Sequence, residues 1–207
     1  MLAALAFGLS TTSPGAQDFA MGRHLTQAKP QAQPVPKAGP APGAEASRRV
    51  TLDDLFARLA AAKDAAEAKG VASLIERRFA RSGSDTADLL MSRSGEALEG
   101  KDAALAVELL DRVTTLKPEW AEAWTRRAAA FYLLDDPVSA LADIRQALTR
   151  EPRHFGAWAA LGHIAMGNDD KKRALDAYRR ALAIHPFLED VKKVVDRIAP
   201  DIDGRDL

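Results

Sequence analysis

The chain of 207 residues contains no cysteine. Disulfide bonds, thiolate metal sites and cysteine nucleophiles are therefore excluded. An excess of charge of either sign is also lacking, because 29 Lys and Arg residues balance 29 Asp and Glu residues. A nucleic-acid-binding protein needs a basic surface that displaces counterions from phosphates, and no run of Lys or Arg supplies one here. We therefore expect no nucleic-acid partner.

Motifs that carry catalysis or bind a cofactor are missing as well. The chain has no nucleophile-elbow, phosphate-loop or dinucleotide-binding glycine pattern. Its four histidines, of which His154 and His163 are the nearest pair, do not share the spacing of metal ligands on one helical face. The sequence thus predicts a protein that is not an enzyme and uses no cofactor or metal.

The N-terminal segment, residues 1–20, allows two interpretations. An apolar run from Leu2 to Leu9 is followed by small residues up to Ala16, a pattern typical of a secretory signal peptide. No Lys or Arg precedes the run, however, so a disordered start is the alternative. We favour the signal peptide and hence a periplasmic or exported protein, with a cytoplasmic one as the alternative. No stretch reaches the roughly 20 apolar residues of a membrane-spanning helix.

A Pro- and Ala-rich segment follows over residues 21–48. It includes Pro30, Pro34, Pro36, Pro40 and Pro42, so it cannot keep helical hydrogen bonds, and we expect an extended linker. The rest of the chain, residues 49–199, is rich in Ala, Leu, Glu and Arg, and shows no strand-like alternation. We expect an all-α domain there, starting at a capping box formed by Thr51 and Asp54.

The decisive feature is a self-match of the chain, in which residues 121–154 align with residues 155–188. The two segments are identical at ten aligned positions. Clear matches are Trp124 with Trp158, Ala140 with Ala174, Ala147 with Ala181, and Pro152 with Pro186. A fixed period of about 34 residues is typical of stacked helical hairpins, each of which buries its apolar face only against its neighbours.

With this period, the pattern W-x-x-L-G over Trp158, Leu161 and Gly162 resembles the tetratricopeptide-repeat (TPR) family. Arg127 stands where the family usually has Leu. The packing positions that the resemblance assigns are Trp124, Ala128, Phe131, Ala140, Ala147, Pro152, Trp158, Leu161, Gly162, Ala174, Tyr178, Ala181 and Pro186.

The resemblance implies an all-α fold, a right-handed superhelix (α-solenoid) of helical hairpins. We predict three clear repeats over 86–120, 121–154 and 155–188, and a degenerate one over 51–85. A capping helix over 187–199 follows, with apolar residues such as Val191, Val194 and Ile198 on one side. Pro200 is expected to end the fold, and residues 200–207 to form a tail.

Family resemblance also implies that the first helices of the hairpins line a concave groove that binds a protein or peptide. The groove residues we predict are Asp88, Met91, Leu98, Glu122, Thr125, Ala129, Tyr132, Leu133, His154, Ala159, His163 and Met166. The apolar ones could alternatively be buried against a neighbouring helix. Some family members hold a C-terminal carboxylate with Lys and Asn. The corresponding faces here carry Thr125, Ala129, Ala159 and His163, which argues against that clamp.

The sequence therefore favours a protein–protein interaction module or scaffold. The alternative is a holdase-like chaperone or assembly factor for unfolded or envelope client proteins. Self-association through the open N-terminal face of the stack is a further hypothesis, since the weakest repeat lies there.

Overall fold

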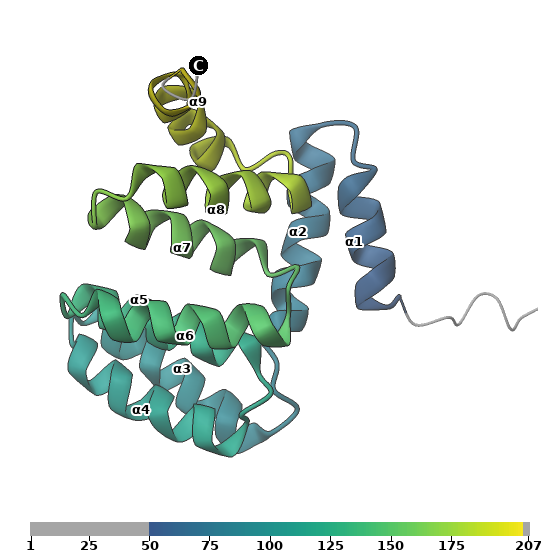
Figure 1. The fold of residues 1–207 in the computed structure, drawn as a ribbon. Helices are drawn as coiled ribbons and strands as arrows, with labels where there is room; N and C mark the ends of the chain where they lie inside the picture. Colours follow the sequence, from purple (N-terminus) through teal and green to yellow (C-terminus); the bar gives the residue numbers. More distant parts are fainter. Residues whose placement is uncertain (1–49, 205–207) are drawn as a thin grey trace, which may run out of the picture. The chain divides into compact units, whose positions relative to one another are not determined.

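The computed structural model describes residues 50–204. The predicted signal peptide or disordered start (1–20) and the predicted linker (21–48) lie outside the described residues. The described part forms helices without strands, which confirms the predicted all-α class (Figure 1). None of the helices in this part is long and apolar enough to cross a membrane. The helices are α1 (Leu52–Ala60), α2 (Ala65–Phe79), α3 (Asp85–Glu99), α4 (Ala103–Leu116), α5 (Ala121–Leu133), α6 (Pro137–Arg150), α7 (Phe155–Gly167), α8 (Lys171–Ile184) and α9 (Glu189–Asp203).

Three hairpins, α3–α4, α5–α6 and α7–α8, stack in chain order. Their turns repeat one geometry, because three non-glycine residues at equivalent positions of the repeats have a positive φ: Lys101 (62°), Asp135 (59°) and Asp169 (56°). A single left-handed residue at this position lets the chain reverse after a helix. The side chain of the next residue then caps the second helix, in the form of Asp102, Asp136 and Asp170.

Proline sets the end of each second helix. The helices α4, α6 and α8 end at Leu116, Arg150 and Ile184, two residues before Pro118, Pro152 and Pro186. The residue before proline is excluded from helical dihedrals, and Lys117, Glu151 and His185 accordingly have φ between −134° and −130°. The repeat boundaries inferred from the prolines thus have a local steric cause.

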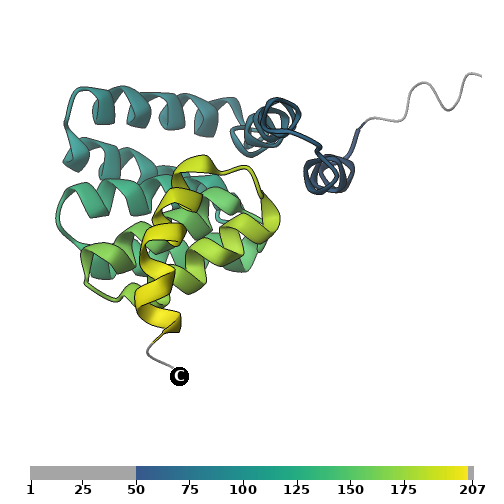
Figure 2. The same ribbon diagram turned by 90° about the horizontal axis from the view of Figure 1, so that it is seen from above.

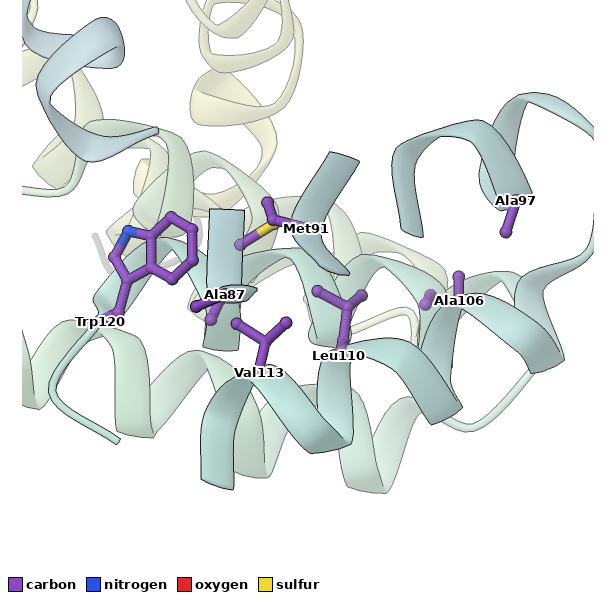
Figure 3. Packing of buried hydrophobic residues seen from close by; sticks show 9 residues of the cluster. Ala87, Met91, Ala97, Ala106, Leu110, Val113 and Trp120 are labelled. Carbon is purple, nitrogen blue, oxygen red and sulfur yellow. The ribbon is translucent and has the colours of Figure 1, made fainter. Parts of the chain in front are cut away.

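Small and large side chains alternate in the core. In the α3–α4 hairpin, Ala87 and Ala106 are fully buried beside Leu110 and Val113, with Met91 and Trp120 filling the space around them (Figure 3). In the α7–α8 hairpin, a Cβ atom at Gly162 would lie only 2.3 Å from Cε1 of Tyr178. Glycine therefore allows the two helices to approach closely at this crossing, because a larger side chain would overlap the Tyr178 ring.

The α1–α2 hairpin forms within the predicted range 51–85, but it is not a further layer of the stack. Figure 2 views α1 and α2 nearly along their axes, whereas α3 to α8 run across the picture. The apolar side of this hairpin, including Phe56, Leu59 and Ile75, packs with Phe155 and Phe187 at the ends of the third repeat. The ion pair between Asp53 and Arg153 (2.6 Å) and the contact of Arg153 with the Phe56 ring (4.4 Å) add to this contact.

The capping helix differs from its prediction at both ends. It covers α8 as expected, with Val191 and Ile198 buried, but it spans Glu189–Asp203 and contains Pro200. The predicted end at residue 199 and the predicted tail from 200 are therefore wrong. Proline removes one helical hydrogen bond but does not end this helix, because Ile202 on the next turn still packs against the same core.

Candidate functional site

The two signature tryptophans occupy matching surroundings in consecutive hairpins. The indole Nε1 of Trp124 donates to the carbonyl of Pro118 (2.9 Å), and that of Trp158 donates to the carbonyl of Pro152 (2.8 Å). An arginine from the second helix of the same hairpin covers each ring: Arg150 lies 4.7 Å from Trp124 and Arg180 lies 4.8 Å from Trp158. Each tryptophan therefore ties the end of the preceding repeat to its own hairpin.

The other predicted packing residues lie at helix contacts or helix ends. Phe131 and Leu161 are half-buried, while Pro152 and Pro186 are exposed at the ends of α6 and α8. The fully buried members are Ala128, Ala140, Ala147, Ala174, Tyr178 and Ala181, with Gly162 also buried.

Arg127, the departure from the family pattern, has a structural partner. Its guanidinium donates two hydrogen bonds to the carboxylate of Asp143 (2.7 and 2.9 Å) and one to Asp111 (2.8 Å). Asp143 is 5% exposed, so its charge needs this partner. The hydrogen bonds to Asp143 outweigh the effect of burial and hold the pKa of Arg127 above its usual value. This residue therefore joins α4, α5 and α6 in place of an apolar contact.

An apolar cavity of about 660 Å³ lies between the C-terminal halves of α5 and α7. Five predicted groove residues line it: Ala129, Tyr132, Leu133, His163 and Met166. No acidic, Lys or Arg side chain is among its lining residues. Tyr132 and Leu133 are 41% and 65% exposed, so a ligand could reach the cavity from solvent. The other three lining residues are Ala160, Ile164 and Gly167. We call this cavity, with its eight lining residues, the open cavity.

His163 is neutral at the rim of the open cavity. Burial lowers its pKa below the ordinary value of 6.5. Its Nδ1 lies 2.9 Å from the hydroxyl of Tyr178, which can donate to the neutral ring. The open cavity thus presents apolar surface and a neutral imidazole.

The opposite end of the predicted groove is covered by α2. The ring of Phe79 stacks on His154 at 4.5 Å, which leaves His154 only 5% exposed. His154 Nδ1 accepts from the backbone N–H of Ala157 (3.2 Å), so Nε2 carries the proton and donates to Glu122 (3.0 Å). His154 is therefore a helix cap and a hydrogen-bond donor to Glu122, and it is a buried residue rather than exposed groove surface.

Glu122 is held in the same place. Burial raises its pKa, but the hydrogen bond from His154 and the charge of Arg126 outweigh burial and leave the pKa below its usual value. Together with Thr125 and Phe79, Glu122 lines a cavity of about 540 Å³ between α2, α5 and α7. Glu122 and Thr125 thus line a cavity that residues of α2 partly enclose.

The remaining predicted groove residues are spread over the first helices. Asp88 and Met91 line a cavity of about 320 Å³ next to α3, yet Met91 is 7% exposed and packs in the core. Leu98 and Ala159 are half-buried and pack against the cores of their own hairpins. For these apolar residues the alternative of burial applies. Most of the other predicted groove residues gather at two places, the open cavity and the cavity beneath α2 that Glu122, Thr125 and His154 line.

Sequence reasoning missed three residues of the open cavity. Ala160, Ile164 and Gly167 follow the spacing i, i+4, i+7 on α7, the same helical face that carries His163. This spacing could have identified them. Phe155 was also missed, because the contact that buries it comes from the α1–α2 hairpin and lies outside the repeat pattern.

Comparisons with known proteins agree with this architecture. The chain matches no family model. It is 33% identical to a TPR repeat-containing protein of Rhizobium etli over 161 residues, which cover 78% of this chain and 79% of that protein. Its fold is similar to the Sgt2 TPR domain of Aspergillus fumigatus (TM-score 0.55, 22% identity, 59% of this chain and 83% of that one). It is also similar to the first TPR domain of Spaghetti (RPAP3), which was solved bound to the HSP90 peptide SRMEEVD (TM-score 0.55, 18% identity, 58% and 95%).

Proposed function

Because this chain belongs to the tetratricopeptide-repeat family, we propose that it binds a segment of another protein through the open cavity. The observation that carries the proposal is the cavity of about 660 Å³ that five predicted groove residues line with apolar atoms. Exposed apolar surface of this kind on a stack of hairpins is typical of an interaction site.

The lining residues indicate what kind of segment would fit. The RPAP3 domain binds a peptide that is mostly acidic at its end. The open cavity contains no Lys or Arg to pair with carboxylates. Tyr132 and Met166 instead offer an amphipathic ring and an adaptable thioether, which suit a segment anchored by a large apolar side chain. We therefore expect an apolar segment rather than an acidic terminus.

The covering of His154 by Phe79 also limits how a ligand would lie. A segment in the open cavity would not continue past the N-terminal ends of α5 and α7, since α2 occupies that region. We expect a short segment, or one that leaves the surface toward α3.

The test is a selection of peptides from a random library displayed on phage, using the full chain as target. The affinity of a selected peptide is then measured by fluorescence anisotropy. Combining Tyr132→Ala with Met166→Ala should weaken binding at least about tenfold, because truncation of central anchors typically costs this much. The matched control is Leu134→Ala with Val138→Ala, two side chains that are 45% and 77% exposed but do not line the open cavity.

Equal loss in both double variants, or no loss in either, would show that the open cavity is not the binding site. Suppression of aggregation of several unrelated unfolded proteins, without a selectable peptide, would support the holdase-like alternative instead. Circular dichroism of each variant confirms that the helices are intact.

A further inference from the structure

Helix α4 carries an apolar stripe that points away from the stack. Leu105 and Leu116 are 43% and 51% exposed, and Leu109 between them is half-buried. With Arg112 they follow the spacing i, i+4, i+7, i+11, which places all four on one helical face. The buried residues of α4, such as Ala106 and Leu110, lie on other faces. We call Leu105, Leu109, Arg112 and Leu116 the α4 stripe.

The repeat itself provides an internal comparison. The equivalent positions of the next repeat, on α6, are Ser139, Asp143, Gln146 and Arg150, all of them polar. Two of these residues contact α5 of their own hairpin, Asp143 through Arg127 and Arg150 over Trp124. On α8 the equivalent residues are Arg173, Ala177, Arg180 and Ile184, so packing within the repeats does not require leucine at these positions. The leucines of the α4 stripe need another explanation, and burial in a further contact is the simplest one.

The position of α4 leaves this stripe uncovered. In Figure 1, α4 lies at one end of the stacked hairpins, and α9 covers α8 at the other end. The preceding hairpin, α1–α2, packs against Phe155 and Phe187 instead of stacking on the α3–α4 hairpin. Within residues 50–204, no helix covers the outward face of α4.

We propose that two copies of this chain pair through the α4 stripe, with their α4 helices antiparallel. The α4 stripe of one copy cannot stack on the α8 end of another, because α9 already covers α8. A two-fold dimer, in which both copies use the same surface, is then the closed arrangement. In an antiparallel pair centred between Leu109 and Arg112, Leu105 contacts Leu116 of the partner subunit. The two-fold symmetry forms this contact twice. The alternation of 4 and 3 residues along the stripe is the spacing that lets two helices interlock.

The charges next to the stripe match the same arrangement. Glu108 and Arg112 are exposed, and neither forms an ion pair within the described part of the chain. Antiparallel packing brings Glu108 next to Arg112 of the partner subunit, and the two-fold axis creates this contact twice. A parallel pair would instead place like charges at equal heights, which is unfavourable. The stripe is thus complementary to itself in the spacing of its leucines and in charge.

The experiment measures the oligomeric state of the full chain by sedimentation equilibrium, from micromolar to near-millimolar concentrations. The wild-type chain should form dimers. Leu105→Ala combined with Leu116→Ala should raise the dissociation constant at least about tenfold, since it removes both leucine pairs that flank the two-fold axis. Leu134→Ala combined with Val138→Ala, which removes exposed apolar surface elsewhere, should leave the dissociation constant unchanged.

Charge reversal gives a sharper test. Glu108→Arg or Arg112→Glu alone places like charges together twice in the dimer, and each should raise the dissociation constant about fivefold to tenfold. The two reversals together restore opposite charges and should return the dissociation constant to near the wild-type value. A monomer at every concentration, or charge reversals that do not compensate, would overturn the proposal. Peptide binding at the open cavity shares no residue with the α4 stripe, so either proposal can fail while the other stands.

Discussion

Replacement of Gly162 by alanine tests the close contact between α7 and α8 at this position. The added Cβ would lie 2.3 Å from Cε1 and 2.5 Å from Cδ1 of Tyr178, whereas carbon atoms normally approach to about 3.5–4.0 Å. The ring would have to move by more than about 1 Å. It is 1% exposed and its hydroxyl is bonded to His163, so it has little freedom to do so.

The expected change in the free energy of unfolding is the sum of two opposing contributions. Overpacking of a core typically costs about 1–3 kcal/mol, and this contact belongs near the upper end. Alanine favours the helix over glycine by about 1 kcal/mol. We therefore expect Gly162→Ala to lower the free energy of unfolding by about 1–2 kcal/mol.

Urea-induced unfolding followed by circular dichroism measures this difference. The matched control is Gly95→Ala on α3, where an added Cβ meets no atom within 4 Å. This variant should gain up to about 1 kcal/mol from helix propensity alone. If Gly162→Ala were as stable as Gly95→Ala, Tyr178 could not pack across Gly162 as described.

Two further predictions concern buried polar groups. Arg127→Leu restores the family residue but leaves Asp143 buried without its partner, so it should cost about 3 kcal/mol of unfolding free energy. Adding Asp143→Ala should recover most of this loss; a double variant no more stable than the single one would refute the pairing. Burial lowers the pKa of His185 below 6.5, so the folded chain binds a proton less readily than the unfolded chain just below that pH. The free energy of unfolding should therefore be highest above pH 6.5 and fall as the pH is lowered. The fall should be smaller in His185→Gln. Equal urea midpoints of the wild-type chain on both sides of pH 6.5 would contradict this.

The repeated part of the fold could be predicted from the sequence because its causes are local. Pro118, Pro152 and Pro186 each end a helix by steric exclusion, and Asp136 and Asp170 cap the second helix of their hairpins through their own side chains. The Tyr178 ring then packs against Gly162 where α7 and α8 lie side by side. These constraints lie within one hairpin or between two adjacent ones, so the repeat period alone reveals them.

The placement of the α1–α2 hairpin could not be predicted in the same way. The periodicity of Phe56 and Leu59 shows which face is apolar, but not which surface that face will meet. The same limit explains the error at His154, which lies on the expected helical face and is covered by Phe79 from a distant segment. The open cavity was partly predictable, since Ala129, Tyr132 and Leu133 depend only on the position of α5 in its own repeat.

The packing of the α1–α2 hairpin on the third repeat has a consequence for how the chain folds. In a simple array every repeat contacts only its neighbours, so folding can begin anywhere and spread. Here the ion pair between Asp53 and Arg153 spans 100 residues, and such distant contacts lengthen the search. The three stacked hairpins depend on short-range contacts, whereas most of the apolar surface against which the first hairpin packs belongs to the third repeat. Packing of the α1–α2 hairpin on the third repeat links the N-terminal and C-terminal parts of the domain. Removal of either part should therefore lower the stability of the other.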